Sequence, residues 1–132
     1  MQRLLLILAQ MLLASAAPAQ MLPKSPTLLQ ILVAPDQYHG RQVQVLGYCR
    51  LEFEGFAIYL SKEDYTYGLG NMVWLKFEKD EDITPQRRKI EYCLVQGTYN
   101  AKDRGHMGLF IGAIENIKRY EPWPPYPVKR PK

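Results

Sequence analysis

The amino-acid sequence predicts a small, mainly β domain. Apolar and polar residues alternate with period two through the run 42–52, which is the pattern of a strand that buries one face. Further runs rich in β-branched and aromatic residues follow, separated by clusters of glycine, proline and charged residues. With 132 residues, 47% of them hydrophobic and 23% charged, the chain fits one globular domain and leaves no room for two.

The first 19 residues have the composition of a secretory signal peptide. Arg3 supplies a positive charge, the run 4–14 is apolar, and residues 17–19 form an Ala-Pro-Ala cleavage pattern. We therefore expect export, cleavage after Ala19, and a periplasmic or extracellular protein with no membrane span in the mature chain. The alternative is a retained membrane anchor, but the apolar run is shorter than the roughly 20 residues that a transmembrane helix needs.

Residues 20–26 are predicted as a disordered leader and residues 27–121 as the domain. The domain opens with a short helix, because the Ser-Pro-Thr run at 25–27 supplies N-cap and first-turn residues. Pro35 ends this helix, and Tyr38 in the following turn is expected to plug one end of the core.

Five strands are expected after this helix. The first two form a hairpin with a turn at Glu54-Gly55, and Tyr48, Arg50 and Glu52 fall on its polar face. The segment 61–70 is treated as a polar connection without a helix. The expected strands span 42–49, 56–60, 72–77, 92–99 and 108–120.

Two of these predictions depend on proline and glycine. The charged connection 79–89 has room for one or two turns of helix after Thr84, which precedes Pro85. In the last strand, isoleucines recur at intervals of three, which also suits a helix. Gly108 and Gly112 would each weaken a helix by about 1 kcal/mol relative to alanine, so we predict a long bulged strand.

The surplus of positive charge lies near the C-terminus. The chain holds 17 Lys and Arg against 13 Asp and Glu, but the segment 20–117 holds 11 against 12. Residues 122–132 are predicted as a Pro-rich basic tail without regular structure. A nearly neutral body lacks the surplus that gives non-specific affinity for phosphates, so nucleic acid is not an expected partner.

The order helix, three strands, short helical connection and two strands is the order expected of an OB-fold, a five-stranded Greek-key barrel. The segment 35–47 resembles the segment that leads into the first strand of such barrels, and residues 27–120 resemble small exported bacterial proteins of OB-like fold. Further points of resemblance lie at 51–55, 62–65 and 105–108. The resemblance implies a fold and a compartment and no particular reaction.

A disulfide is predicted between Cys49 and Cys93. Two cysteines in an exported chain are expected to pair, and both fall on the core side of their strands. In an OB-like barrel the first and fourth strands pair antiparallel. Aligning Gly47 with Val95 then places Cys49 directly opposite Cys93. Gly47 and Gly97, each inside a strand, are expected to mark bends or close backbone approaches.

The expected ligand site is the face of the second and third strands, flanked by two loops, as in other OB-folds. Parity turns Tyr59 and Trp74 outward on this face, where the rings could stack on a saccharide or contact a peptide or protein partner. Equally, the two rings could merely cover the sheet. The flanking loops are expected to contribute Glu52, Glu54, Arg104 and His106.

The leading hypothesis is therefore a non-catalytic binding module without a cofactor. A hydrolase-type enzyme is the alternative, with His106 as general acid or base and Glu52 or Glu54 as its orienting carboxylate. Nucleic-acid binding is a lesser alternative. His39 is expected to be a solvated loop residue, and two histidines far apart with two paired cysteines make a poor ligand set for a metal. Oligomeric state is not predicted.

Overall fold

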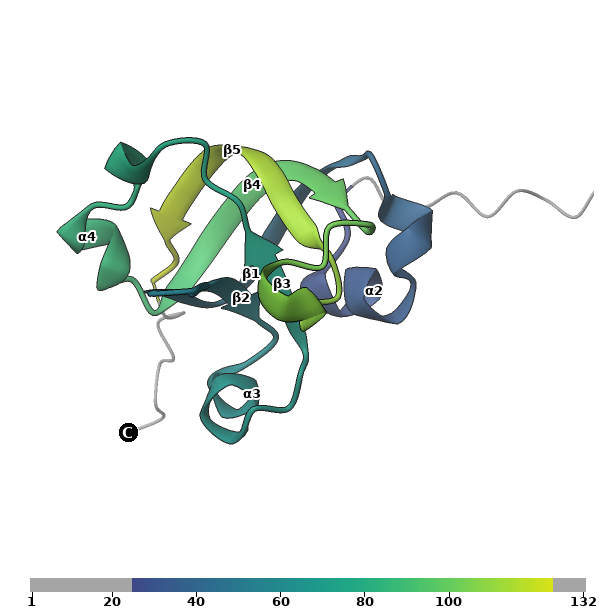
Figure 1. Ribbon diagram of the computed structural model, residues 1–132, viewed down its shortest axis with the longest axis horizontal. Coiled ribbons are helices and arrows are strands. Elements are labelled where there is room, and N and C mark those ends of the chain that lie inside the picture. The colour runs from purple at the N-terminus through teal and green to yellow at the C-terminus, as the bar shows by residue number, and fades with distance from the viewer. Residues whose placement is uncertain (1–24, 125–132) are drawn as a thin grey trace, which may run out of the picture.

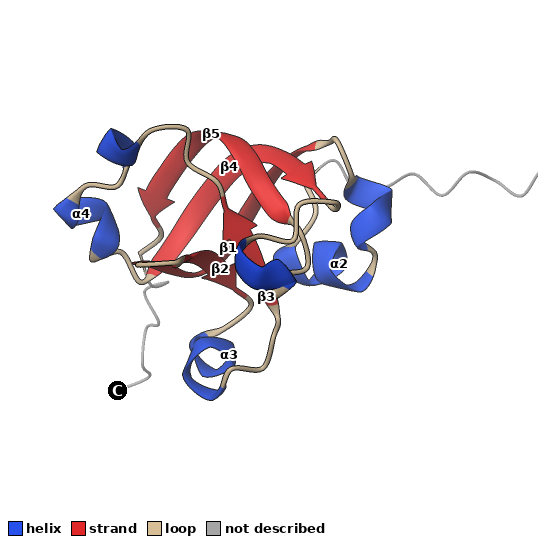
Figure 2. Cartoon of the chain, in the orientation of Figure 1, coloured by secondary structure: helices blue, strands red, loops and turns tan. Residues whose placement is uncertain are grey.

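The computed structural model describes residues 25–124, and it is mainly β with a few short helices (Figures 1 and 2). The predicted signal peptide, most of the leader and the tail beyond Pro124 lie outside the described residues. The strands are β1 (Gln42–Glu52), β2 (Gly55–Tyr59), β3 (Met72–Leu75), β4 (Tyr92–Asn100) and β5 (Ala113–Pro122). The helices are α2 (Leu28–Val33), α3 (Lys62–Tyr67) and α4 (Pro85–Arg88), with 3₁₀ turns at Pro35–Tyr38, Asp80–Asp82 and His106–Gly108.

The five strands form one barrel-like sheet in the order β1-β2-β3-β5-β4. Strand β4 also pairs with β1, so each strand has two hydrogen-bonded neighbours. All pairs are antiparallel except β3 and β5, which run parallel. The predicted hairpin is confirmed, with Glu52 opposite Gly55 at its turn.

The short N-terminal helix is confirmed as α2. Thr27 is its N-cap: the Thr27 hydroxyl accepts from the amide of Gln30 at 3.2 Å, and the Gln30 side chain accepts from the amide of Thr27 at 2.9 Å. Leu28 and Ile31 are buried in the core, as is Tyr38 in the turn that follows. The helix expected after Thr84 is also present, as α4.

Helix α3 was not predicted. The segment is polar, but Ser61 is an N-cap whose hydroxyl accepts from the amide of Asp64 at 3.2 Å, and Gly68 ends the helix in the left-handed conformation at φ 62°. Serine followed three residues later by an acid, with glycine after one further turn, is a signal of a short capped helix. It was overlooked because the helix carries no apolar stripe.

The last strand is bulged, as predicted, but it begins five residues later than expected. Gly108 and Gly112 have positive φ values of 67° and 133°, and the regular strand begins after them, at Ala113. Between β4 and β5 the pairing shifts, because Gln96 lies opposite Arg119 while Thr98 lies opposite Glu115.

The disulfide between Cys49 and Cys93 is present, with 5.9 Å between the Cα atoms, and both residues are fully buried. The register expected around it is wrong by two residues, because Gly47 lies opposite Cys93 and Val45 opposite Val95. The bond therefore joins diagonal neighbours. A shift of two leaves every side chain on its own face, so the alternation of apolar residues could not reveal it.

Candidate functional site

The loop that joins β1 to β2 meets the loop that joins β4 to β5. Nε2 of His106 lies 3.5 Å from Oε2 of Glu54, and this contact links the two loops. Glu54 and Met107 both have φ of 55°, a region that non-glycine residues rarely adopt. Strained backbone of this kind concentrates at functional sites. Of the six predicted site residues, the structure thus brings together one acid and the histidine.

Three large apolar side chains project from these linked loops. Phe53 is 89% exposed, Met107 79% and Leu109 59%. Single exposed apolar residues are ordinary, but these three stand on two loops that contact each other through Glu54 and His106. None of the three was predicted as a site residue, because each stands beside a charged or glycine residue in a segment without periodicity. We call Phe53, Met107 and Leu109, with Glu54 and His106, the loop-tip cluster.

The predicted aromatic face is largely covered by the protein itself. Tyr59 lies opposite Met72 and Trp74 opposite Ala57, so Tyr59 and Trp74 share a face diagonally, as expected. Both rings are half-buried. The Trp74 ring packs edge-on against Phe110 in the β4–β5 loop, with 5.0 Å between centroids.

Gly105 in the same loop lies so close to Trp74 that a Cβ there would be 2.9 Å from the Trp74 Cβ. Tyr59 packs against Tyr65 of α3 at 5.3 Å. These contacts match the alternative in which the two rings cover the sheet, and they leave less ring surface for stacking on a sugar.

Glu52 lies apart from His106 and instead docks α3 onto the barrel. Its carboxylate accepts from Nε of Arg50 at 3.0 Å and from the Tyr65 hydroxyl at 2.8 Å. The Arg50 guanidinium lies over the Tyr65 ring, 4.9 Å from its centroid. Burial opposes ionisation of Glu52, but the hydrogen bonds from Arg50 and Tyr65 outweigh it and lower the pKa of Glu52. The structure therefore gives Glu52 a positioning role.

Arg104 closes the β4–β5 loop. Its Nε donates to the carbonyl of Phe110 at 3.0 Å, and its own carbonyl accepts from the amide of Phe110 at 3.1 Å. Lys76 reaches the same loop, with Nζ 3.2 Å from the carboxylate of Asp103. These contacts hold the backbone that presents His106 and Met107.

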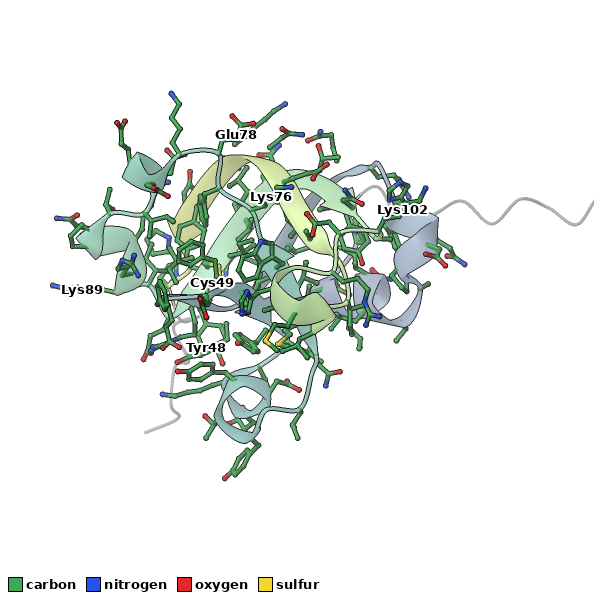
Figure 3. The ribbon with its side chains drawn as sticks, in the orientation of Figure 1. Tyr48, Cys49, Lys76, Glu78, Lys89 and Lys102 are labelled. Carbon is green, nitrogen blue, oxygen red and sulfur yellow. A yellow bond between two sulfur atoms is a disulfide. The ribbon has the colours of Figure 1, made fainter. Side chains whose placement is uncertain are left out.

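A row of aromatic residues crosses the outer face of the sheet. Tyr59 pairs with Tyr48, and Tyr48 pairs with Tyr92. Tyr48 was expected to face solvent, but Tyr65 and Tyr92 pack on it with centroids 5.6 and 5.4 Å away and bury it beside α3 (Figure 3). Parity alone predicted exposure because the helix that covers Tyr48 was not foreseen. The row continues to Trp123, whose amide donates to the carbonyl of Tyr92 at 2.9 Å.

Within residues 25–124 no three His, Cys, Asp or Glu side chains are grouped to hold a metal ion. No helix in that range is long and apolar enough to cross a membrane. His39 is exposed, and its Nδ1 accepts from the amide of Ala101 at 3.1 Å.

No family model, curated protein or solved structure matches this chain.

Proposed function

We propose that the protein is an exported, non-catalytic binding module of OB-like Greek-key fold, and that it holds a peptide or protein partner with the loop-tip cluster. The strand order, the parallel pairing of β3 with β5 and the position of α4 between β3 and β4 support the OB-like assignment. In that fold the β1–β2 and β4–β5 loops flank the ligand-binding face.

The observation that carries the proposal is the contact between His106 and Glu54. It joins the two loops on which Phe53, Met107 and Leu109 are exposed. Exposed aromatic and methionine side chains are typical of protein interfaces, where Phe and Met are enriched. A saccharide is less well supported, because Tyr59 and Trp74 are covered by Tyr65 and Phe110.

Export is supported by the disulfide and by the composition of residues 1–19. Disulfides persist in oxidising compartments such as the periplasm and the cell exterior. Cleavage after Ala19 remains a prediction, and the intact mass of protein recovered from either compartment tests it. A mass that still includes Met1 would contradict it.

The binding surface is tested with a phage-displayed random peptide library selected on the folded protein. Peptides enriched on the wild type should lose at least tenfold in affinity for the variants Phe53→Ser and Met107→Ser. Tyr67→Ser, which changes another exposed large side chain, on α3, is the matched control and should bind normally. If all three variants bind the selected peptides as tightly as the wild type does, the binding surface lies elsewhere. If no peptide is enriched, peptide binding is rejected.

The contact between His106 and Glu54 also favours a second candidate, the hydrolase-type enzyme. A carboxylate beside an imidazole can orient it as a general base. Against this, within residues 25–124 no hydroxyl or thiol hydrogen-bonds to His106, and both cysteines are paired. The test is hydrolysis of p-nitrophenyl acetate. Activity in the wild type that is lost both in Glu54→Gln and in His106→Gln would favour the enzyme over the binding module.

A further inference from the structure

A hollow of about 630 Å³ lies where β4 begins and β5 ends. It is lined by residues 89–92 and 122–124, all of them within the described part of the chain. Sites for small ligands have volumes of about 300–1,000 Å³, so the hollow is large enough to hold one. None of its lining residues belongs to the loop-tip cluster, so it is a separate candidate site.

Two aromatic side chains of the hollow come from neighbouring strands. Cys93 lies opposite Pro122, and the amide of Trp123 donates to the carbonyl of Tyr92 at 2.9 Å, so Tyr92 and Trp123 are cross-strand neighbours. Tyr92 is 45% exposed and Trp123 52%. The Tyr92 ring packs edge-on against Tyr48, with 5.4 Å between centroids, whereas the Trp123 ring packs on no other aromatic ring of residues 25–124. Two large rings are thus left partly uncovered side by side.

The wall that carries Tyr92 is anchored to the barrel. The carbonyl of Glu91 accepts from the amide of Cys49 at 2.6 Å, and Cys93, which follows Tyr92, is bonded to Cys49 by the disulfide. A site whose walls are fixed before binding spends less free energy on ordering them when the ligand arrives. The hollow is therefore a preformed site.

The rim of the hollow carries one positive charge that is not balanced. The Lys89 side chain is exposed at the end of the molecule that carries α4 (Figure 3), and among residues 25–124 its ammonium group has neither an ion pair nor a hydrogen bond. The carboxylate of Glu91, two residues further on, already lies 3.9 Å from Nζ of Lys62. An anionic group on a ligand therefore complements Lys89.

We propose that this hollow binds an acidic saccharide, with its sugar rings on Trp123 and Tyr92 and a carboxylate on Lys89. The C–H faces of a sugar ring suit exposed aromatic rings, and its hydroxyl groups can donate to the Glu91 carboxylate. Proline-rich peptides also bind aromatic grooves, but a proline segment has no negative charge for Lys89 and no amide donor for Glu91. The charges at the rim therefore favour the saccharide.

Isothermal titration calorimetry of the chain without residues 1–19 tests the ligand class. Tetragalacturonic acid should bind with saturation, and its affinity should fall as the salt concentration is raised. Maltotetraose, a neutral saccharide of the same length, should bind about tenfold more weakly, because it has no carboxylate for Lys89. No binding of tetragalacturonic acid, equal affinity for the two saccharides, or tighter binding of a decaproline peptide would each overturn the proposal.

Variants of the two walls test the site itself. Trp123→Ala should bind tetragalacturonic acid about tenfold more weakly, because one of the two rings is lost. Lys89→Gln should bind the acidic and the neutral saccharide equally. Lys102→Gln, which changes an exposed lysine at the opposite end of the molecule in Figure 3, is the matched control and should keep the preference for the acid. Phe53→Ser should also bind normally, so this test is independent of the loop-tip cluster.

Thermal melts show whether each variant is folded. A folded Trp123→Ala protein with wild-type affinity would overturn the proposal, as would a Lys89→Gln protein that keeps the preference for tetragalacturonic acid. The Lys89 side chain is exposed and has no partner within residues 25–124, so its replacement leaves the fold intact. The Lys89→Gln result therefore decides the question even if Trp123→Ala unfolds.

Discussion

At the scale of single residues, two glycines let the strands approach closely enough to curve. Gly47 and Gly97 stand in a Val-x-Gly phrase that occurs in both β1 and β4. A Cβ on Gly47 would lie 2.6 Å from the carbonyl oxygen of Tyr59, and one on Gly97 would lie 2.6 Å from that of Glu115. Both obstacles are backbone atoms. The expectation that these glycines mark close backbone approaches is confirmed.

Replacing Gly47 with alanine should lower the free energy of unfolding by about 1–3 kcal/mol, because backbone must move to admit the methyl group. Gly55→Ala is the matched control. Its Cβ would meet nothing nearer than 3.8 Å, so this variant should stay within about 0.5 kcal/mol of the wild type. Urea denaturation measures both changes. A Gly47→Ala protein as stable as the Gly55→Ala protein would refute the close approach.

Removing the hydroxyl group should affect stability differently at two buried tyrosines. The Tyr99 hydroxyl donates to the carbonyl of Ile111, and burial raises the pKa of Tyr99 to about 12, so it stays protonated at neutral pH. The buried hydroxyl of Tyr120 has no hydrogen-bond partner among residues 25–124. Tyr99→Phe should therefore cost about 1 kcal/mol or more of stability, whereas Tyr120→Phe should be neutral or stabilising. Thermal melts of the two variants measure the change. A Tyr99→Phe protein that is more stable than the Tyr120→Phe protein would contradict these hydrogen-bond assignments.

At the scale of elements, helix α3 shows both what the sequence predicts and what it does not. The strands were predictable because alternation survives in β1 even where the outer residues are later covered. Helix α3 depends instead on local caps at Ser61 and Gly68 and on docking through Tyr65 and Glu52. The hydrogen bond between Tyr65 and Glu52 joins residues 13 positions apart in two different elements, and no periodic pattern in the sequence indicates it.

Asp64 fastens α3 to the strand that follows it. Its carboxylate accepts from the Ser61 hydroxyl at 2.5 Å and from the Asn71 amide at 2.7 Å, and these bonds lower the pKa of Asp64, with the Ser61 bond the larger cause. A lowered pKa means that the unfolded chain takes up the proton first as the pH falls. The stabilisation is therefore complete above the ordinary aspartate pKa of about 3.9 and is lost as the pH falls through the lower folded value.

The stability difference between the wild type and Asp64→Asn should accordingly shrink as the pH is lowered from 6 to 3. Guanidinium denaturation at several pH values measures it, with Glu63→Gln, exposed on the same helix, as the control. A difference that stays constant across this range would show that the Asp64 pKa is not lowered.

At the scale of the whole molecule, the disulfide joins β1 to β4 across 44 positions of sequence. A loop of this length gives about 4 kcal/mol of stabilisation in the chain-entropy model. Replacing both Cys49 and Cys93 with serine should lower the free energy of unfolding by several kcal/mol, as measured by urea denaturation. Thiol titration of the unfolded, unreduced wild type should find no free thiol. Two free thiols would refute the bond.

The candidate site was predictable only in part. The expected topology placed the β1–β2 and β4–β5 loops on either side of one ligand face, and the contact between Glu54 and His106 shows that the two loops meet. The covering of Trp74 was not predictable, because Phe110 and Gly105 reach it from a loop without regular structure. The exposed side chain of Phe53 was missed for the same reason, since a two-residue turn has no period to interpret.

The pairing of β1 with β4 also determines the order in which parts of the sheet can form. A chain that emerges N-terminus first presents β1 with one edge bonded to β2 and the other bare until residues 92–100 have emerged. Contacts this distant in sequence form slowly, and a bare strand edge invites pairing with other chains. Until β4 is available, the bare edge of β1 is therefore open to pairing with a strand of another chain.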